Sequence, residues 1–213
     1  YDQAASQQGF GILDLAGTIL ALQEGTFQFM DSKNELSEGA ADEYKIKVTD
    51  KNMPVKVTLA WSDPPGSLED GSALINDLDL YVQAPNGKEF MGNDFTYQGK
   101  KDHINNVEQV TIEVPETGEY TIGVQAGKIG AGNGQDYGLA YGQALKTGVV
   151  EKADSDKLIL ADGTTLNLDS VKLQQVVDGV MTDARTPAMP GSEVYFKADK
   201  AYVFGQSWHT GGV

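Results

Sequence analysis

The chain has 213 residues and a formal charge of −15, from 16 lysine and arginine residues against 31 aspartate and glutamate residues. This charge excludes a nucleic-acid-binding surface and an anionic-membrane surface, because both need clustered cations. The absence of cysteine excludes disulfides, thiolate metal sites and thiol catalysis. The 40% of hydrophobic residues is enough for packed cores. The first residue is Tyr1 rather than methionine, so we expect a cut or processed piece of a longer chain.

Residues 11–22 predict one amphipathic helix near the start of the chain. Apolar residues three or four positions apart would form a single stripe along it, at Ile12, Leu15, Ile19 and Leu22. Gly25 is a plausible stop signal for this helix. Residues 31–42 are polar and acidic, and they predict a connector.

From residue 43 the hydrophobic pattern changes to a period of two, which is typical of β-strands. Turn signals such as Pro85-Asn86-Gly87 separate the alternating segments. These segments are 44–48, 55–61, 79–83, 107–114, 119–126 and 137–144, with a shorter one near 88–92. The pattern predicts an all-β fold, an antiparallel β-sandwich or jelly roll at residues 43–146, preceded by one short helix.

Residues 147–213 predict a second, small all-β module. An Asp162-Gly163 turn lies between two alternating segments and predicts one hairpin, and a second hairpin is expected about residues 198–199. A further short strand is expected at residues 176–181. The domains expected are therefore 1–42, 43–146 and 147–213.

No set of side chains in the sequence predicts catalysis by this chain alone. The two histidines, His103 and His209, have no serine nucleophile motif near them, and His103 is expected to be a solvated loop residue. The glycine-rich stretch at 127–134 lacks a phosphate-loop ending and predicts a connection between strands. Paired carboxylates are plentiful, so counting them does not exclude glycoside hydrolysis.

The acidic residues favour aspartate, with 19 Asp against 12 Glu, and their positions suggest a calcium site. Asp77 and Asp79 are two apart, so in an extended strand both would project from the side opposite Leu78 and Leu80. Carboxylates and amides recur downstream in loops, at residues 92–94 and 102–108. The alternative is a set of solvated Asp and Asn turns.

Several segments together resemble the C-terminal β-sandwich of a subgroup of secreted subtilisin-like serine proteases, in which a jelly-roll domain follows the catalytic domain. The segments are VTLAWSDPPGS at 57–67, ALINDLDLYVQAPNGKEFMGNDF at 73–95, NNVEQVTIEVPETGEYTIGVQA at 105–126 and YGLAYGQA at 137–144. QGFGILDLAGTIL at 8–20 resembles the last part of a subtilase catalytic domain, where a turn leads into the final helix. Residues 147–213 resemble no family.

The resemblance implies a sandwich similar in shape to the P domain of proprotein convertases, which packs on the catalytic domain and carries calcium. It implies metal ligands at Asp79, Asp102, the backbone oxygen of Ile104, Asn106 or Glu108, and Asp77. The subtilase Asp, His and Ser motifs are absent from this sequence, so no activity is expected of this chain alone. The parent expected from the resemblance is a secreted subtilisin-like serine endopeptidase, whose catalytic domain would be the partner.

A different class of function is a secreted carbohydrate-binding or adhesion-type β-sandwich module. Such modules hold ligands on exposed aromatic residues. Trp61 shares a predicted strand face with Val57 and Leu59, which predicts a core position. The freer aromatic candidates are Tyr97, Tyr137, Tyr141 and Trp208.

Overall fold

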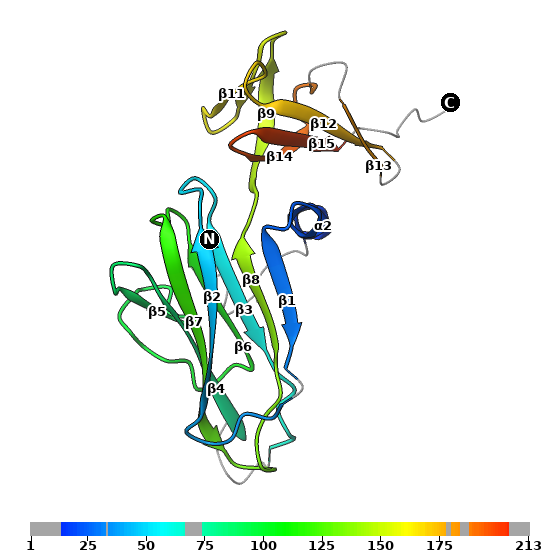
Figure 1. Cartoon of the computed structure of the whole chain (residues 1–213). Helices are drawn as coiled ribbons and strands as arrows, with labels where there is room; N and C mark the ends of the chain where they lie inside the picture. Colours follow the sequence, from blue (N-terminus) through cyan, green and yellow to red (C-terminus); the bar gives the residue numbers. More distant parts are fainter. Residues whose placement is uncertain (1–13, 33, 67–73, 178–179, 184–187, 205–213) are drawn as a thin grey trace, which may run out of the picture.

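The computed structural model describes residues 14–32, 34–66, 74–177, 180–183 and 188–204. Within these ranges the chain forms β-sheets and one short helix (Figure 1). This arrangement confirms the predicted all-β fold class. None of the described helical residues forms a segment long and apolar enough to cross a membrane.

The first part of the chain forms a sandwich of two four-stranded antiparallel sheets. One sheet has the order β1-β8-β3-β6 and the other has the order β2-β7-β4-β5. This alternation of strands between two sheets is that of a jelly roll. The strands of the first sheet are β1 (Phe27–Asp31), β8 (Gly138–Gln143), β3 (Val55–Ala60) and β6 (Val107–Ile112). Those of the second are β2 (Ala41–Val48), β7 (Gly118–Ile129), β4 (Asn76–Gln83) and β5 (Glu89–Met91).

The core lies between the two sheets, where every second residue of each strand points inward. Val55, Val57 and Leu59 of β3 are fully buried, and Trp61 follows them at the end of the same face. The Trp61 indole nitrogen donates a hydrogen bond of 3.0 Å to the carbonyl oxygen of Asn76. The period of two therefore identified the inner face of this strand correctly.

Two strand ends differ from the sequence-based expectation. Val114 was expected to continue the inner face of β6, but the strand ends at Ile112 and Val114 is exposed. The glycine-rich stretch at 127–134 was expected to be a loop, but β7 runs to Ile129. In the second case, pairing with β4 extends the strand beyond the sequence-based end, because Lys128 and Ile129 lie opposite Asp77 and Asn76.

Strand β1 was not predicted, and it belongs to the sandwich. It pairs along its whole length with β8, from Phe27 opposite Gly142 to Asp31 opposite Gly138. The acidic connector expected at residues 31–42 is correspondingly shorter, because β2 already begins at Ala41. A five-residue strand with Gln and Asp in it carries little periodic signal, so its partner strand determines its structure.

Replacing Gly142 by alanine is expected to destabilise the protein by about 3 kcal/mol, a large overpacking cost. A Cβ at this position would lie 2.7 Å from the Cα of Phe27 and would also meet the carbonyl oxygen of Thr26, so β1 would have to move away from β8. Gly138→Ala in the same strand is the control, because its Cβ would meet nothing closer than 3.8 Å. Urea unfolding measures both variants. Equal stability of the two would contradict the pairing of β1 with β8.

The C-terminal sheet has seven strands in the order β11-β10-β9-β14-β15-β12-β13. Its pairs are antiparallel except for β12 with β15, which are parallel. The strands are β9 (Lys146–Ala153), β10 (Lys157–Leu160), β11 (Thr165–Asn167), β12 (Lys172–Val177), β13 (Val180–Asp183), β14 (Glu193–Lys197) and β15 (Lys200–Phe204).

Both predicted hairpins occur in this sheet, as β10–β11 and β14–β15. A single short strand was expected at residues 176–181. Instead, this segment holds the end of β12 and the start of β13, and the two strands pair with Val177 opposite Val180. A valine on each side of Asp178-Gly179 was mistaken for one continuous run, although this dipeptide is a common hairpin signal.

Helix α2 (Leu15–Gln23) lies between β1 and the C-terminal sheet (Figure 1). Asp14 is its N-cap, and the Asp14 carboxylate accepts a hydrogen bond of 2.8 Å from the Gly17 backbone nitrogen. Residues 11–13 of the predicted helix, including Ile12, lie outside the described residues. The helix buries Leu20 and Ala21, and not the expected apolar stripe. Three members of that stripe are exposed to 59%, 45% and 49%, namely Leu15, Ile19 and Leu22.

Candidate metal centre

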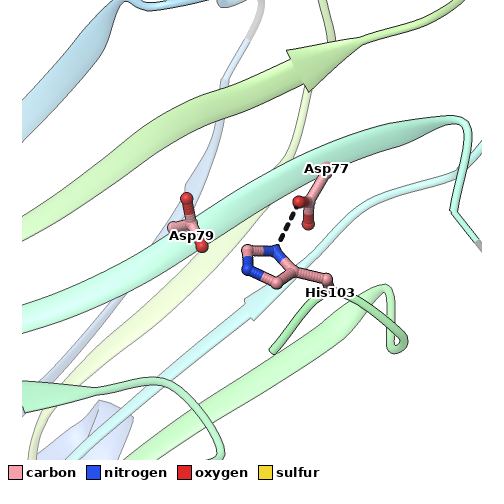
Figure 2. Close-up of side chains that lie close together, drawn as sticks. All are labelled: Asp77, Asp79 and His103. Atoms are coloured by element: carbon pink, nitrogen blue, oxygen red, sulfur yellow. Dashed lines mark hydrogen bonds and ion pairs between the residues drawn. The ribbon is translucent and has the colours of Figure 1, made fainter. Parts of the chain in front are cut away.

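Two aspartates of β4 are buried on the outer side of the second sandwich sheet. Leu78 and Leu80 of the same strand enter the core, so Asp77 and Asp79 project from the other face. They are nevertheless only 8% and 2% exposed. Side chains of the loop between β5 and β6 cover them, as Figure 2 shows for His103 beside Asp77 and Asp79.

The covering loop places basic groups against both carboxylates. Lys101 Nζ lies 2.8 Å from Asp79 Oδ2, and His103 Nδ1 lies 2.7 Å from Asp77 Oδ2. His103 lies in a loop with a side chain that is 61% exposed, as expected, and its ring also contacts Asp77, which was not expected. Sequence reasoning missed the matched spacing of these residues. Lys101 and His103 are two positions apart, as are the two aspartates, and they pair with the aspartates in reverse order.

Glu108 brings a third carboxylate from the other sheet. It shares the inner face of β6 with Val110 and Ile112 and is 1% exposed. Glu108 Oε2 accepts a hydrogen bond of 2.7 Å from the Leu80 backbone nitrogen on β4. Gly92 makes room for it, since a Cβ there would lie 2.8 Å from the Glu108 Cβ. This carboxylate therefore joins the two sheets, and its charge interacts with those of Asp79 and Asp77.

Burial and mutual repulsion make this cluster costly when it is fully ionised. Burial first, and then the charges of Asp79, Asp102 and Asp77, together raise the pKa of Glu108 to about 8, against the opposing effect of the Leu80 hydrogen bond. Burial likewise raises the pKa of Asp77, with His103 opposing the shift and Asp79 adding to it. Lys101 is the one cationic group whose ammonium contacts the cluster among the described residues. The site therefore carries excess negative charge.

Each of the three buried carboxylates has one oxygen without a hydrogen-bond partner. These atoms are Asp77 Oδ1, Asp79 Oδ1 and Glu108 Oε1. Buried carboxylate oxygens are rarely left in this state, because desolvation without a partner costs free energy. Ligand atoms of Asp77, Asp79 and His103 also lie within 4.8 Å of one another. Oxygen atoms of this kind fit a hard divalent cation.

The other residues that the resemblance implied as ligands make hydrogen bonds within the loop, to Asn93 and to Trp61. Burial alone would raise the pKa of Asp102, but amide donors from Asn105 and Asn93 and the backbone hold it below its usual range. The Asn106 side-chain nitrogen donates to the Trp61 carbonyl oxygen at 2.9 Å. The Ile104 side chain is exposed, and its backbone nitrogen donates to Asp102.

The aromatic residues considered for ligand binding are mostly unavailable. Tyr137 and Tyr141 are buried, which corrects their expected freedom, and their hydroxyls donate to Asp42 and Gln28. Tyr97 is exposed. Trp208 lies outside the described residues, as does His209. The described part of the chain therefore offers no row of exposed tyrosines.

The comparison with protein families bears on the part of the chain that holds the acidic cluster. Residues 40–126 match the model of the bacterial pre-peptidase C-terminal domain. The match runs from the start of β2 into β7 and includes Asp77, Asp79 and Glu108. This part of the chain is similar to a non-catalytic C-terminal domain of bacterial peptidases.

No curated protein matches the chain. Among solved structures, the CUB1-EGF-CUB2 domain of human MASP-1/3 is 10% identical, with a TM-score of 0.29 over 65% of this chain and 55% of that one. The catalytic unit of a thermostable GH87 α-1,3-glucanase from Streptomyces thermodiastaticus strain HF3-3 is 13% identical, with a TM-score of 0.27 over 61% of this chain and 28% of that one. The chain thus spans about half or less of these proteins, and similarity at this level carries no functional argument.

Proposed function

We propose that this chain is the non-catalytic C-terminal region of a secreted bacterial peptidase of the subtilisin-like type. In this role it packs on the catalytic domain and stabilises it with bound calcium. The observation that carries the proposal is the match of residues 40–126 to a domain that follows bacterial peptidases. The subtilisin-like parent rests on the resemblance of residues 8–20 to the end of a subtilase catalytic domain.

The exposed stripe of α2 supports contact with a catalytic domain. The helix sequence LAGTILALQ contains no charged residue, and an apolar stripe on a helix normally packs against a partner surface. Here Leu20 and Ala21 are buried, whereas Leu15, Ile19 and Leu22 face outward. A catalytic domain attached before α2 in the same precursor would reach the molecule at this stripe.

Calcium is the cation that the acidic cluster suits best. The three unpartnered atoms are all carboxylate oxygens, which hard cations prefer. Asp77, Asp79 and Glu108 would hold the ion, and its positive charge would offset the repulsion among them. The side chains of Lys101 and His103 are 39% and 61% exposed, so both have solvent to move into when a cation takes their place.

Millimolar calcium is expected to raise the melting temperature of chelator-treated protein by several degrees or more, because an ion that binds only the folded state stabilises it by mass action. Differential scanning calorimetry with EGTA, calcium, magnesium or zinc measures this effect. Asp79→Asn is expected to lose the calcium response. Asp162→Asn, in the β10–β11 turn, is the control and should keep it. Identical melting of the parent protein with chelator and with calcium would exclude the site.

The accessory role and the carbohydrate-binding alternative are separated by two binding experiments. The full chain is immobilised and exposed first to a separately produced subtilisin-like catalytic domain and then to a panel of polysaccharides. Capture of the catalytic domain, weakened by Ile19→Asp on the exposed stripe, supports the proposal. Retention of a polysaccharide without capture of the catalytic domain would replace it with a carbohydrate-binding function.

A further inference from the structure

One hairpin of the C-terminal sheet holds both ends of helix α2. About 180 residues separate the helix from this hairpin along the chain. At the N-terminus, Asp14 Oδ1 accepts a hydrogen bond of 2.9 Å from the Tyr195 hydroxyl on β14. At the C-terminus, the Glu24 carboxylate lies 2.8 Å from Lys197 Nζ on β14 and 3.1 Å from Lys200 Nζ on β15. The Tyr202 hydroxyl donates to the same carboxylate. The residues that cap the helix therefore also bind the β14–β15 hairpin.

An apolar cluster fills the space between these polar contacts. Leu20 of the helix and Tyr202 of β15 are 1% and 0% exposed, and Tyr195 packs with them. Met53, from the turn before β3, and Leu145, from the link between β8 and β9, complete the cluster. The helix, the sandwich and the C-terminal sheet therefore meet at one buried joint, close to where Figure 1 shows α2.

The sequence of α2 does not account for its stability without this joint. A helix of nine residues is marginal in water, because nucleation costs more than so few hydrogen bonds return. Glu24 places a negative charge at the C-terminal end, where the helix dipole disfavours it. Lys197 and Lys200 reverse that penalty by pairing with the same carboxylate. An acid at this position is explained by the hairpin and not by the helix.

We propose that the C-terminal sheet acts as a clamp for the N-terminal helix, with the β14–β15 hairpin as the surface that receives α2. The partner of this surface is the chain's own helix, bound through its two caps and through Leu20. The clamp assigns a role to residues 146–204 that the family match at 40–126 does not cover. It also fixes the orientation of whatever precedes the helix. The proposal stands independently of the peptidase assignment.

The test is hydrogen exchange measured by mass spectrometry on the full chain. Tyr195→Phe and Tyr202→Phe together remove both hydroxyl contacts while they keep the rings that fill the joint. Hydrogen bonds to charged groups are worth enough that amide exchange in α2 is expected to be about 10-fold or more faster. Exchange in β3 of the sandwich is expected to stay unchanged. Lys152→Met, which breaks an exposed ion pair on β9, is the control and should alter neither region.

Two results would overturn the clamp. Unchanged exchange in α2 would show that the hairpin does not hold the helix. An equal increase in α2 and in β3 would show a loss of global stability and no local clamp. If the double variant fails to fold, the single variant Lys200→Met is used with the same readout, because Lys197 still pairs with Glu24 in it.

Discussion

Replacing Glu108 by glutamine is expected to stabilise the chelator-treated protein at pH 8 and to remove its response to calcium. Burial raises the pKa of Glu108 from 4.5 to about 8. Between these two values the folded protein keeps a proton that the unfolded chain releases, so the stability of the parent protein falls as pH rises. The loss between pH 5 and pH 8 is about 3 kcal/mol at 1.36 kcal/mol per pKa unit. Glutamine has no such proton, and its oxygen can still accept the Leu80 backbone hydrogen bond.

Urea unfolding in EGTA at pH 5, 6.5 and 8 measures this difference. The free energy of unfolding of the parent protein is expected to decrease along the series, while that of Glu108→Gln stays nearly level. Glu89→Gln, an exposed substitution on β5, is the control and should follow the parent protein. A parent protein whose stability is level or rises over this range would contradict the buried, protonated state of Glu108.

Calcium is expected to reverse the order of stability, so that the parent protein becomes more stable than Glu108→Gln. A bound cation favours the ionised form of its carboxylate ligands, so it offsets the cost of ionising Glu108. In millimolar calcium the parent protein should become more stable as pH rises towards 8, while Glu108→Gln gains little. A calcium response of the same size in both proteins would remove Glu108 from the ligand set and leave only the two aspartates of β4.

Part of the candidate site could be predicted from the sequence because strand periodicity is local. Alternation placed Asp77 and Asp79 on the side opposite Leu78 and Leu80. The same alternation places Glu108 in line with Val110 and Ile112, and an acid in phase with a core face is a usable signal for a buried site. The approach of Lys101 and His103 could not be predicted, because it depends on the path of a loop over the sheet.

The fold shows the same division between local and distant information. Strands with clear alternation, such as β3 and β6, were located because each carries its own pattern. Strand β1 carries little pattern, and its structure depends on β8, more than 100 residues later. The buried side of α2 is decided by Tyr202 and other residues of the joint. Because the helix also carries apolar residues outside the predicted stripe, at Leu20 and Ala21, periodicity alone did not decide which side is buried.

Replacing Glu24 by glutamine is expected to destabilise the protein at pH 7 by about 3 kcal/mol, the equivalent of its pKa shift at 1.36 kcal/mol per unit. Burial alone would raise the pKa of Glu24, but its bonds to Lys197, Tyr202 and Lys200 lower it from 4.5 to about 2. The Glu24 side chain is 9% exposed, so solvent screens these contacts little. Asp199 is the other acid in this group, 3.5 Å from Lys197 Nζ, and it does not replace Glu24 at the helix.

The pH dependence distinguishes this ionic contact from simple packing. Because the folded-state pKa is depressed, the stabilisation by Glu24 is fully present above pH 4.5 and is lost as pH falls towards 2. Urea unfolding at pH 7, 4 and 2.5 should therefore show the difference between the parent protein and Glu24→Gln shrinking along the series. Glu151→Gln, exposed on β9, is the matched control and should track the parent protein. If the difference in free energy of unfolding is the same at all three pH values, Glu24 stabilises the joint through packing and not through its charge.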